Sequence, residues 1–525
     1  MSFLHLKSVK NLQNLARQSV DLTQDGVFNG ERIETMRQSA IGFDLLYAAE
    51  RVTPAVIEAL FELSDEAMAM QKMADMQAGV EMNRIEGFDS EQRAVLHTAM
   101  RDQFTHRQKA KNAMAASDMA QAELQKLERF LEVLDRENRF TDLIQIGIGG
   151  SDLGPRALYL ALLPFARPHH RVHFISNVDP DDANNVLNRV DLKKTLVVVV
   201  SKSGTTLETL TNEEFVRARL QKLGLDPKEH FIAVTGEKSP MDNPAKYKAS
   251  FYIWDFVGGR YSSTSMAGAV AIGFAYGFSA LMEILRGAHA MDAHAMTKRN
   301  LPLLSALLGI WNRNFLQLPT AAVVPYSQAL IRFPAHLQQL DMESNGKSVD
   351  ITGHFVDFST GPVVWGEIGT NAQHSFYQLI HQGTQAIPVE FIGFRKSQHP
   401  FDLDVKGSSS QEKLLANLFA QSIALAKGQK SANPNRFFPG NRPNRILLAD
   451  RLDPYTLGAL LAFYEHKVAL QGFIWNINSF DQEGVQLGKV LASQILDLFA
   501  AQRSSKSGPS FEVGEAYLRI LNAKK

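Results

Sequence analysis

The chain of 525 residues contains no cysteine and carries no net charge, because 55 Lys and Arg residues balance 55 Asp and Glu residues. The lack of cysteine excludes disulfide bridges, thiolate nucleophiles and cysteine-ligated metal sites. The charge balance gives no support for a dedicated nucleic-acid binder or for a protein that adheres to an anionic membrane surface. A chain without cysteine also fits a reducing compartment, so we expect a cytoplasmic protein.

Signals for export or membrane insertion are lacking as well. Residues 1–7 show no basic segment followed by a long apolar run, so no secretory signal is expected. The longest apolar stretch, residues 266–282, is interrupted by Tyr276, Gly277 and Ser279, and we interpret it as a buried core helix. An apolar fraction of 45% and a charged fraction of 21% are typical of a soluble globular protein.

The length predicts two to four structural units at about 150 residues each. Residues 51–77 and 91–133 have apolar side chains at three- and four-residue spacing, which predicts helices. Beyond them, short apolar runs alternate with helical segments, a pattern that predicts parallel, doubly wound sheets covered by helices. The fold class is therefore α/β, with four expected parts: a helical N-terminal region (1–135), a first α/β domain (136–295), a second α/β domain (296–503), and a C-terminal spacer and helix (504–525).

The expected elements are as follows. The strand candidates are residues 140–148, 171–175, 195–200, 230–234 and 251–254 in the first α/β domain, and 321–325, 361–365, 387–394 and 468–476 in the second. Expected helices include 155–163, 207–223, 374–381, 411–427, 454–466 and 511–521. Polar residues 286–300 are the expected domain boundary, 429–445 an expected loop, and 504–510 an expected spacer.

A glycine-rich loop follows the first predicted strand. Gly150 and Ser151 lie at the centre of this loop. Its glycines let backbone amides approach an anionic or polyhydroxyl ligand at a helix N-terminus. A dinucleotide site is not indicated, because Asp152 stands where the third glycine of G-x-G-x-x-G belongs. The alternative is a tight strand–helix turn without a ligand.

A hydroxyl-rich loop follows the third predicted strand, and we interpret it as a phosphate site. Its residues are Ser201, Lys202, Ser203, Gly204, Thr205 and Thr206. Hydroxyls and amides hold phosphate by hydrogen bonds, and a lysine adds positive charge. The nucleotide-binding pattern G-x-x-x-x-G-K-[ST] does not occur here. The alternative is a helix cap, which needs only one of these hydroxyls.

Two charged residues are candidates for chemistry on a polar substrate. Arg260 follows two glycines, and an arginine stabilises developing oxyanions, although a structural ion pair is the commoner role. Glu343 lies among amides, a serine, a glycine and a lysine, and would share a helical face with Gln339 four residues earlier. The alternative for Glu343 is a solvated surface carboxylate.

Further candidates come from the second half of the chain. His374 could move protons near neutral pH, and His381 lies seven residues further on, but no metal-ligand spacing accompanies them, so no metal site is predicted. Gln482, Gln486 and Lys489 would form one stripe of a helix, which is ordinarily a solvated face.

The ordered set of motifs resembles the glucose-6-phosphate isomerase family. The matching segments are Gly-Gly-Ser-Asp-Leu-Gly (149–154), Ser-Lys-Ser-Gly-Thr-Thr (201–206), Val-Gly-Gly-Arg-Tyr-Ser (257–262), Met-Glu-Ser-Asn-Gly-Lys (342–347), Gly-Thr-Asn-Ala-Gln-His (369–374) and Phe-Asp-Gln-Glu-Gly-Val (480–485). The resemblance implies two sugar-isomerase domains, a homodimer and the reversible conversion of glucose 6-phosphate to fructose 6-phosphate without cofactor or metal.

The resemblance also implies a role for each candidate. Glu343 would carry a proton between C2 and C1, and Arg260 would stabilise the enediolate. His374, from the other subunit, and Lys489 would assist ring opening. The remaining candidates would bind substrate: Gly150 and Ser151 the sugar, residues 201–206 the phosphate, and Gln339 and Gln482 the substrate.

Three departures from the common family pattern affect these expectations. Ser203 and Gly204 stand where Thr and Phe are common, which keeps the hydroxyl and predicts a more mobile loop. Ser263-Thr264 replaces a Leu-Trp pair, and Gln486 replaces a glutamate near Lys489.

The alternatives to this function are an isomerase of another phosphosugar or one that also accepts mannose 6-phosphate, a non-catalytic sugar-phosphate sensor, and a secreted signalling protein. The last has no export signal to support it.

Overall fold

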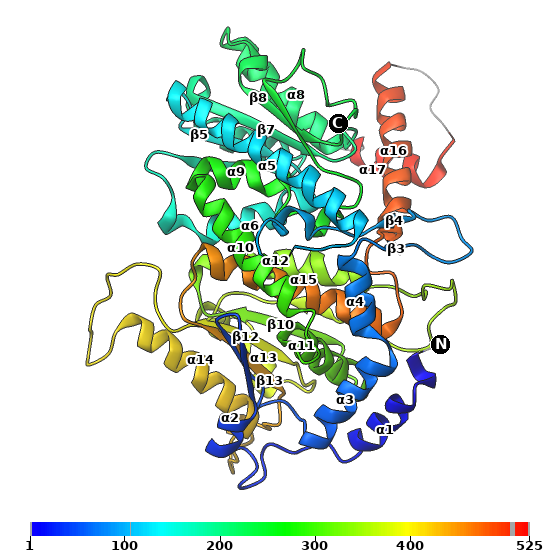
Figure 1. Cartoon of the computed structure of the whole chain (residues 1–525), viewed down its shortest axis with the longest axis vertical. Helices are drawn as coiled ribbons and strands as arrows, with labels where there is room; N and C mark the ends of the chain where they lie inside the picture. The colour runs from blue at the N-terminus through cyan, green and yellow to red at the C-terminus, as the bar shows by residue number, and fades with distance from the viewer. Residues whose placement is uncertain (1–2, 106, 505–509, 523–525) are drawn as a thin grey trace. The chain divides into compact units, whose positions relative to one another are not determined.

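The structure is a computed structural model that describes residues 3–105, 107–504 and 510–522. It divides into two units, Met1–Phe480 and Asp481–Lys525. The first unit contains two largely parallel sheets, with α12 (Phe333–Gln338) and α15 (Pro454–Trp475) lying between them in Figure 1. Within the described residues, no helix is long and apolar enough to cross a membrane.

The first sheet has five parallel strands in the order β6-β5-β7-β8-β9. They are β5 (Asp142–Ile146), β6 (Arg171–Ile175), β7 (Thr195–Ser201), β8 (Phe231–Thr235) and β9 (Ala249–Tyr252), which confirms all five expected strands within a few residues. Every residue of β7 is buried, because helices cover both faces of a doubly wound sheet. The chain turns to opposite sides after β5 and β7, so the loops after these neighbouring strands flank a switch point, where such sheets bind ligands.

The second sheet has the order β1-β2-β13-β12-β10-β11. Its parallel strands are β10 (Thr320–Pro325), β11 (Val363–Trp365), β12 (Val389–Phe394) and β13 (Asn444–Ala449). The hairpin β1 (Arg37–Ala40) and β2 (Phe43–Leu46) joins it antiparallel to β13. The N-terminal region is therefore not purely helical. Ile41 and Gly42 both have positive φ, the conformation that a tight hairpin turn requires.

Two sequence predictions in the second sheet are wrong. Of residues 468–476, expected as a strand, 468–475 belong to helix α15 and Asn476 caps it, and β13 begins inside the segment that was expected to be a loop. Nearly all of α15 is buried, so apolar residues are spread around the helix and its sequence lacks the 3.6-residue period that identifies a surface helix.

The expected helices at 91–133 and the expected boundary at 286–300 also need correction. Residues 93–94 form strand β4 (Arg93–Ala94), which pairs with β3 (Glu81–Asn83), and the helix α5 begins only at Lys111 (Lys111–Glu137). Most of the segment 286–300 continues helix α10 (Phe278–His294). A polar, alanine-rich segment can be the exposed end of a helix as readily as a linker.

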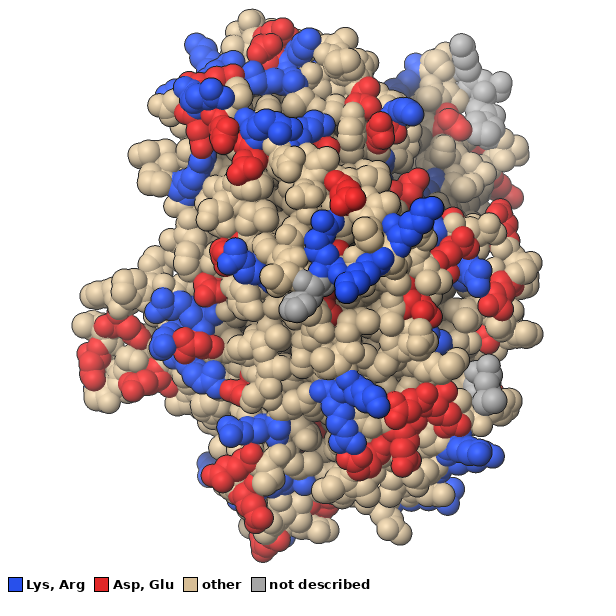
Figure 2. Space-filling view, in the orientation of Figure 1, with Lys and Arg blue, Asp and Glu red and all other residues tan. Residues whose placement is uncertain are grey.

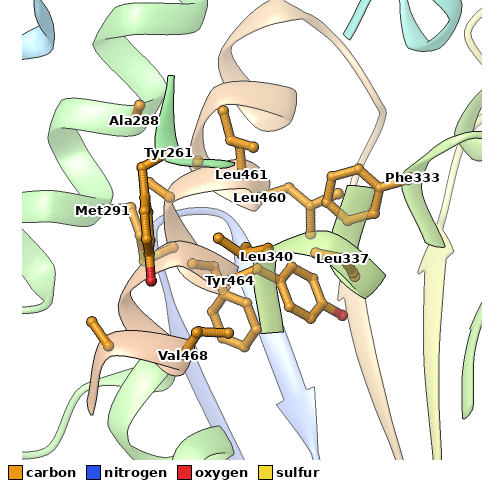
Figure 3. Packing of buried hydrophobic residues seen from close by; sticks show 14 of the residues in the cluster. Tyr261, Ala288, Met291, Phe333, Leu337, Leu340, Leu460, Leu461, Tyr464 and Val468 are labelled. Carbon is orange, nitrogen blue, oxygen red and sulfur yellow. The ribbon is translucent and has the colours of Figure 1, made fainter. Parts of the chain in front are cut away.

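The apolar stretch 266–282 forms buried core helices, as expected, but it breaks at Gly277. Helix α9 (Met266–Tyr276) is buried along its whole length, and α10 starts immediately after Gly277, whose φ of +85° ends α9. Helix α10 packs against α15, and Figure 3 shows this core, with Met291 of α10 and Leu460, Leu461 and Tyr464 of α15.

Further α-helices occur in both units. In the first unit they are α1 (Lys7–Ala16), α2 (Gly30–Thr35), α3 (Pro54–Glu66), α4 (Ala69–Gln77), α6 (Leu153–Ala161), α7 (Pro180–Leu187), α8 (Leu207–Lys222), α11 (Leu301–Ile310), α13 (Tyr377–Gln382) and α14 (Ser410–Lys427). The second unit contains α16 (Gln486–Ser504) and the expected final helix, α17 (Glu512–Asn522). The expected spacer 504–510 falls mostly outside the described residues.

Candidate active site

The glycine-rich loop after β5 packs directly against residues 257–262, the arginine loop, which contains Arg260. A Cβ atom on Gly150 would lie 2.0 Å from the carbonyl oxygen of Gly259, so no other residue fits there without moving backbone. Gly149 has a φ of +59°, and its missing Cβ would lie 3.2 Å from Nε2 of Gln339. Sequence reasoning attributed the glycines to the approach of a ligand. In the structure they also allow three segments of the chain to meet.

The hydroxyl-rich loop after β7 is folded on itself. Oγ of Ser201 and Oγ1 of Thr206 are 2.9 Å apart, and the amide and hydroxyl of Thr205 donate to Oγ of Ser203 at 3.2 and 2.9 Å. Helix α8 starts at Leu207, and its N-cap residue Thr206 makes no side-chain capping bond. The loop is therefore not explained as a helix cap, and the open amides of the first turn of α8 are suited to an anion.

Gly204 is constrained in this loop. Its φ is +68°, and a Cβ there would lie 2.9 Å from Oγ of Ser239. The sequence predicted a more mobile loop because glycine replaces a larger residue. The conformation is one that favours glycine, and the neighbouring serine leaves little room for a side chain.

Lys202 connects the hydroxyl-rich loop to the arginine loop. Its Nζ donates to the carbonyl oxygen of Val257 at 3.1 Å. Burial, reinforced by the positive charge of Arg93, lowers the pKa of Lys202 to about 8. The ammonium group therefore points toward the segment that precedes Arg260, and it remains mostly protonated at neutral pH.

Arg260 is completely buried and held at both ends of its guanidinium. Its Nε donates to Oγ of Ser344 and its Nη2 to the carbonyl oxygen of Ser479, both at 2.6 Å. Its Nη1 lies 3.5 Å from Oε1 of Glu343. A buried guanidinium with an acidic neighbour keeps its charge, and its bonds to Ser344 and Ser479 fix the direction in which it points.

Glu343 ends a π-helical turn, Gln339–Glu343, that continues α12. Its side chain keeps 22% of its surface exposed, so a substrate can reach the carboxylate that Arg260 faces from the protein side. Nζ of Lys347 donates to the backbone carbonyl of Glu343 at 2.8 Å, which closes the end of the turn. π-turns occur frequently at functional sites.

Asp341, on the same turn, faces the interior. It is buried, and burial raises the pKa of its carboxyl to about 6, although the positive charge of Lys467 opposes the shift. Asp341 lines a pocket of about 40 Å³ together with Glu390, Arg445 and Lys467. The turn thus has one acidic residue directed inward and one, Glu343, that reaches the surface.

Two further candidates, His374 and His381, follow β11 in the chain. His374 is exposed at the end of a short 3-10 helix, Asn371–His374, after β11. His381 contacts Oε1 of Gln421 through Nε2 at 2.8 Å, and the described residues contain no group of three or more potential metal ligands. Gln482 and Lys489 belong to the second unit, Lys489 in the first turn of α16, and are described only within that unit.

Sequence reasoning missed three residues that hold the site together. They are Tyr261, Ser344 and Ser479, and Oη of Tyr261 lies 3.0 Å from Oγ of Ser344. Ser344 is adjacent to Glu343, but no local pattern indicates that it contacts an arginine 84 residues earlier. Ser263 and Thr264, where the family often has larger residues, are buried, and Ser263 packs against Gly154.

A doubly wound α/β fold with a hydroxyl-rich loop, a carboxylate and a buried arginine is the arrangement expected of a sugar-phosphate isomerase. Comparison with known proteins identifies the particular family. Residues 46–513 match the family described as phosphoglucose isomerase, and the chain belongs to that family.

Individual relatives agree with this assignment over the full length. The glucose-6-phosphate isomerase of Protochlamydia amoebophila is 57% identical over 524 residues, which cover 99% of this chain and 97% of that protein. That of Chlamydia caviae is 54% identical over 523 residues, 99% of this chain and 98% of that protein. The crystal structure of a glucose-6-phosphate isomerase from Chlamydia trachomatis superimposes with a TM-score of 0.96 at 50% identity and covers 100% of both chains.

Proposed function

We propose that Glu343 is the base with which this chain interconverts glucose 6-phosphate and fructose 6-phosphate, a step of glycolysis and gluconeogenesis, through a cis-enediolate. The activity follows from membership of the family and from relatives of that name at 50–57% identity over the full chain. The observation that carries the residue assignment is the 3.5 Å separation between Oε1 of Glu343 and Nη1 of the buried Arg260.

The chemistry needs a base beside a positive charge. The base removes the proton from C2, and the electrons move toward O1, so negative charge develops on the enediolate oxygens. Protonated Glu343 then returns the proton to C1 while the proton of the O2 hydroxyl passes to O1, which leaves a carbonyl at C2 and a hydroxyl at C1. Arg260 cannot lose its own proton, and its bonds to Ser344 and Ser479 hold its charge in place before the enediolate forms, which is the condition for electrostatic stabilisation.

The phosphate would be bound by residues 201–206, and Gly150, Ser151, Gln339 and Gln482 would contact the substrate. Two features support the loop assignment: Ser203 and Thr205 are exposed, and the amides at the start of α8 have no side-chain cap. The amide Nε2 of Gln339 borders Gly149, which supports a role for Gln339 beside the glycine-rich loop. Lys202 would add positive charge from its position behind the loop.

Ring opening would require His374 and Lys489, with His374 supplied by the second subunit of a homodimer. The exposure of His374 supports a role at a subunit interface. Mixing Glu343→Gln with His374→Ala chains tests this arrangement. If His374 acts across the interface, mixed dimers regain one complete site and about half the activity of a normal dimer. If it acts within its own chain, the mixture stays inactive.

The reaction class is tested by exchange of the C2 hydrogen. Glucose 6-phosphate incubated with the protein in deuterated water and EDTA should incorporate deuterium as it converts to fructose 6-phosphate. A sugar-phosphate sensor would give neither exchange nor conversion. Loss of activity in EDTA would contradict the metal-free mechanism, and a faster reaction with another phosphosugar would contradict the substrate.

The organisation and location of the enzyme complete the proposal. We assign the two sugar-isomerase domains to residues 136–295 and 296–503, which is supported by the five strands within 142–252 and the four parallel strands within 320–449. Residues 1–135 precede them and 504–525 follow. The cysteine-free composition supports a cytoplasmic location.

A further inference from the structure

A cluster of five buried titratable side chains contacts Tyr261 through His97, and the proposed mechanism uses none of them. The members are His97, Arg101, Asp292 of α10, and Glu465 and His466 of α15, each with at most 5% of its surface exposed. Figure 3 shows Tyr261 among the apolar residues of α10 and α15, the two helices that supply three of the five members.

Within the cluster, the charges are paired by short contacts. Nε of Arg101 lies 2.7 Å from Asp292, and Nη1 of Arg101 lies 2.6 Å from Glu465. Nε2 of His466 lies 2.6 Å from the other oxygen of Asp292. Burial opposes ionisation of Asp292, but the charge of Arg101 and the contact with His466 outweigh it, so the pKa of Asp292 is lowered. Burial raises the pKa of Glu465 to about 7 and lowers that of His466, so the Arg101–Asp292 ion pair is the charged part of a cluster that short polar contacts hold together.

His97 differs from the other members because it lies against Tyr261. The two rings are stacked, with centroids 4.7 Å apart and planes inclined by 27°. Burial and the charge of Arg101 lower the pKa of His97 well below its usual value, so the ring is neutral. Neither ring nitrogen has a hydrogen-bond partner among the described residues. His97 therefore contacts the site through the face of its ring.

The contact continues from Tyr261 to the reacting groups. Oη of Tyr261 lies 3.0 Å from Oγ of Ser344, the same oxygen that accepts the hydrogen bond from Nε of Arg260. Ser344 directly follows Glu343 in the chain. A shift of the tyrosine ring would therefore move Ser344, which accepts a hydrogen bond from Arg260 and is the chain neighbour of Glu343.

We infer that His97 is a positioning residue for the isomerisation: its ring holds Tyr261 in place, and Tyr261, through Ser344, holds Arg260 against Glu343. The inference rests on the proposed roles of Glu343 and Arg260. A misplacement of catalytic groups by about 1 Å can reduce turnover by about 10²-fold, whereas the ring contacts of His97 are with Tyr261 and His466 and not with the proposed phosphate loop, residues 201–206.

The test is a double-mutant cycle between His97→Ala and Tyr261→Phe, with kcat and KM measured for each variant. His97→Ala should lower kcat by about 10²-fold and change KM by less than about threefold. The double variant should be no slower than the slower single variant, because both changes break the same connection. His97→Phe, which restores a flat neutral ring, should recover most of the turnover.

Two controls separate positioning from general damage. His170→Ala removes another histidine–aromatic pair, with Phe274 at 5.0 Å, at the amino end of β6, and should leave kcat unchanged. If His97→Ala does not fold, His97→Gln replaces it in the cycle. Multiplicative effects of the two substitutions, or a raised KM with normal kcat, would overturn the inference. An inactive wild type would instead refute the proposed function.

Discussion

Replacing Glu343 by glutamine is the most direct test of the site. Glutamine has nearly the same shape as glutamate, but its amide cannot take up the C2 proton. Arg260 keeps its bonds to Ser344 and Ser479, so the surrounding structure should persist. The substitution therefore removes one chemical function and changes little else.

The expected loss follows from the role of a general base. Such a residue contributes about 10²- to 10⁴-fold to rate. At about 1.4 kcal/mol for each factor of ten, this corresponds to a barrier increase of about 3–6 kcal/mol. Because the proposed phosphate loop, residues 201–206, is a separate segment from the π-turn that contains Glu343, KM should change by less than about threefold.

The assay is the initial rate in both directions with purified wild-type protein and variants. Glu283→Gln is the matched control, because Glu283 pairs with Arg286 at 3.3 Å on the exposed surface of α10 and should leave kcat unchanged. Figure 2 shows that such acidic and basic side chains are interspersed over the surface in view. A Glu343→Gln enzyme with at least a third of the wild-type kcat would refute the assignment of the base, as would a large rise in KM at constant kcat.

Two further predictions concern the loops. Gly150→Ala should lower the free energy of unfolding by about 1–3 kcal/mol or more in urea titration, because its Cβ would lie 2.0 Å from a backbone oxygen. Gly259→Ala, whose Cβ has nothing within 4 Å, should be nearly neutral, and equal losses would contradict the steric argument. KM should rise as the pH passes about 8, where Lys202 loses its proton and its attraction for phosphate, by about fivefold at most for a loss of roughly 1 kcal/mol. Lys202→Arg should not show this rise, and an identical rise would assign it to another group.

The sequence by itself determined the local elements and the order of the motifs. Strands such as β7 are short apolar runs bounded by polar loops, so their position could be predicted to within a residue or two. The loops after β5 and β7 could be identified because glycines and hydroxyls gather where a strand ends and a helix begins. Glu343 and Arg260 could be named because each lies within a distinctive local motif.

Only the tertiary structure decided how these parts meet. The contact between Arg260 and Ser344 spans 84 residues, that between Arg260 and Ser479 spans 219, and the hairpin β1–β2 joins a strand some 400 positions away in the sequence. The first part of the buried α15 was predicted as a helix, but its second part, residues 468–475, could not be told from a strand, and the π-turn at Glu343 has no sequence period of its own. Side-chain periodicity records which face of a local element is buried, whereas the partner on that face is determined by the packing of the whole chain.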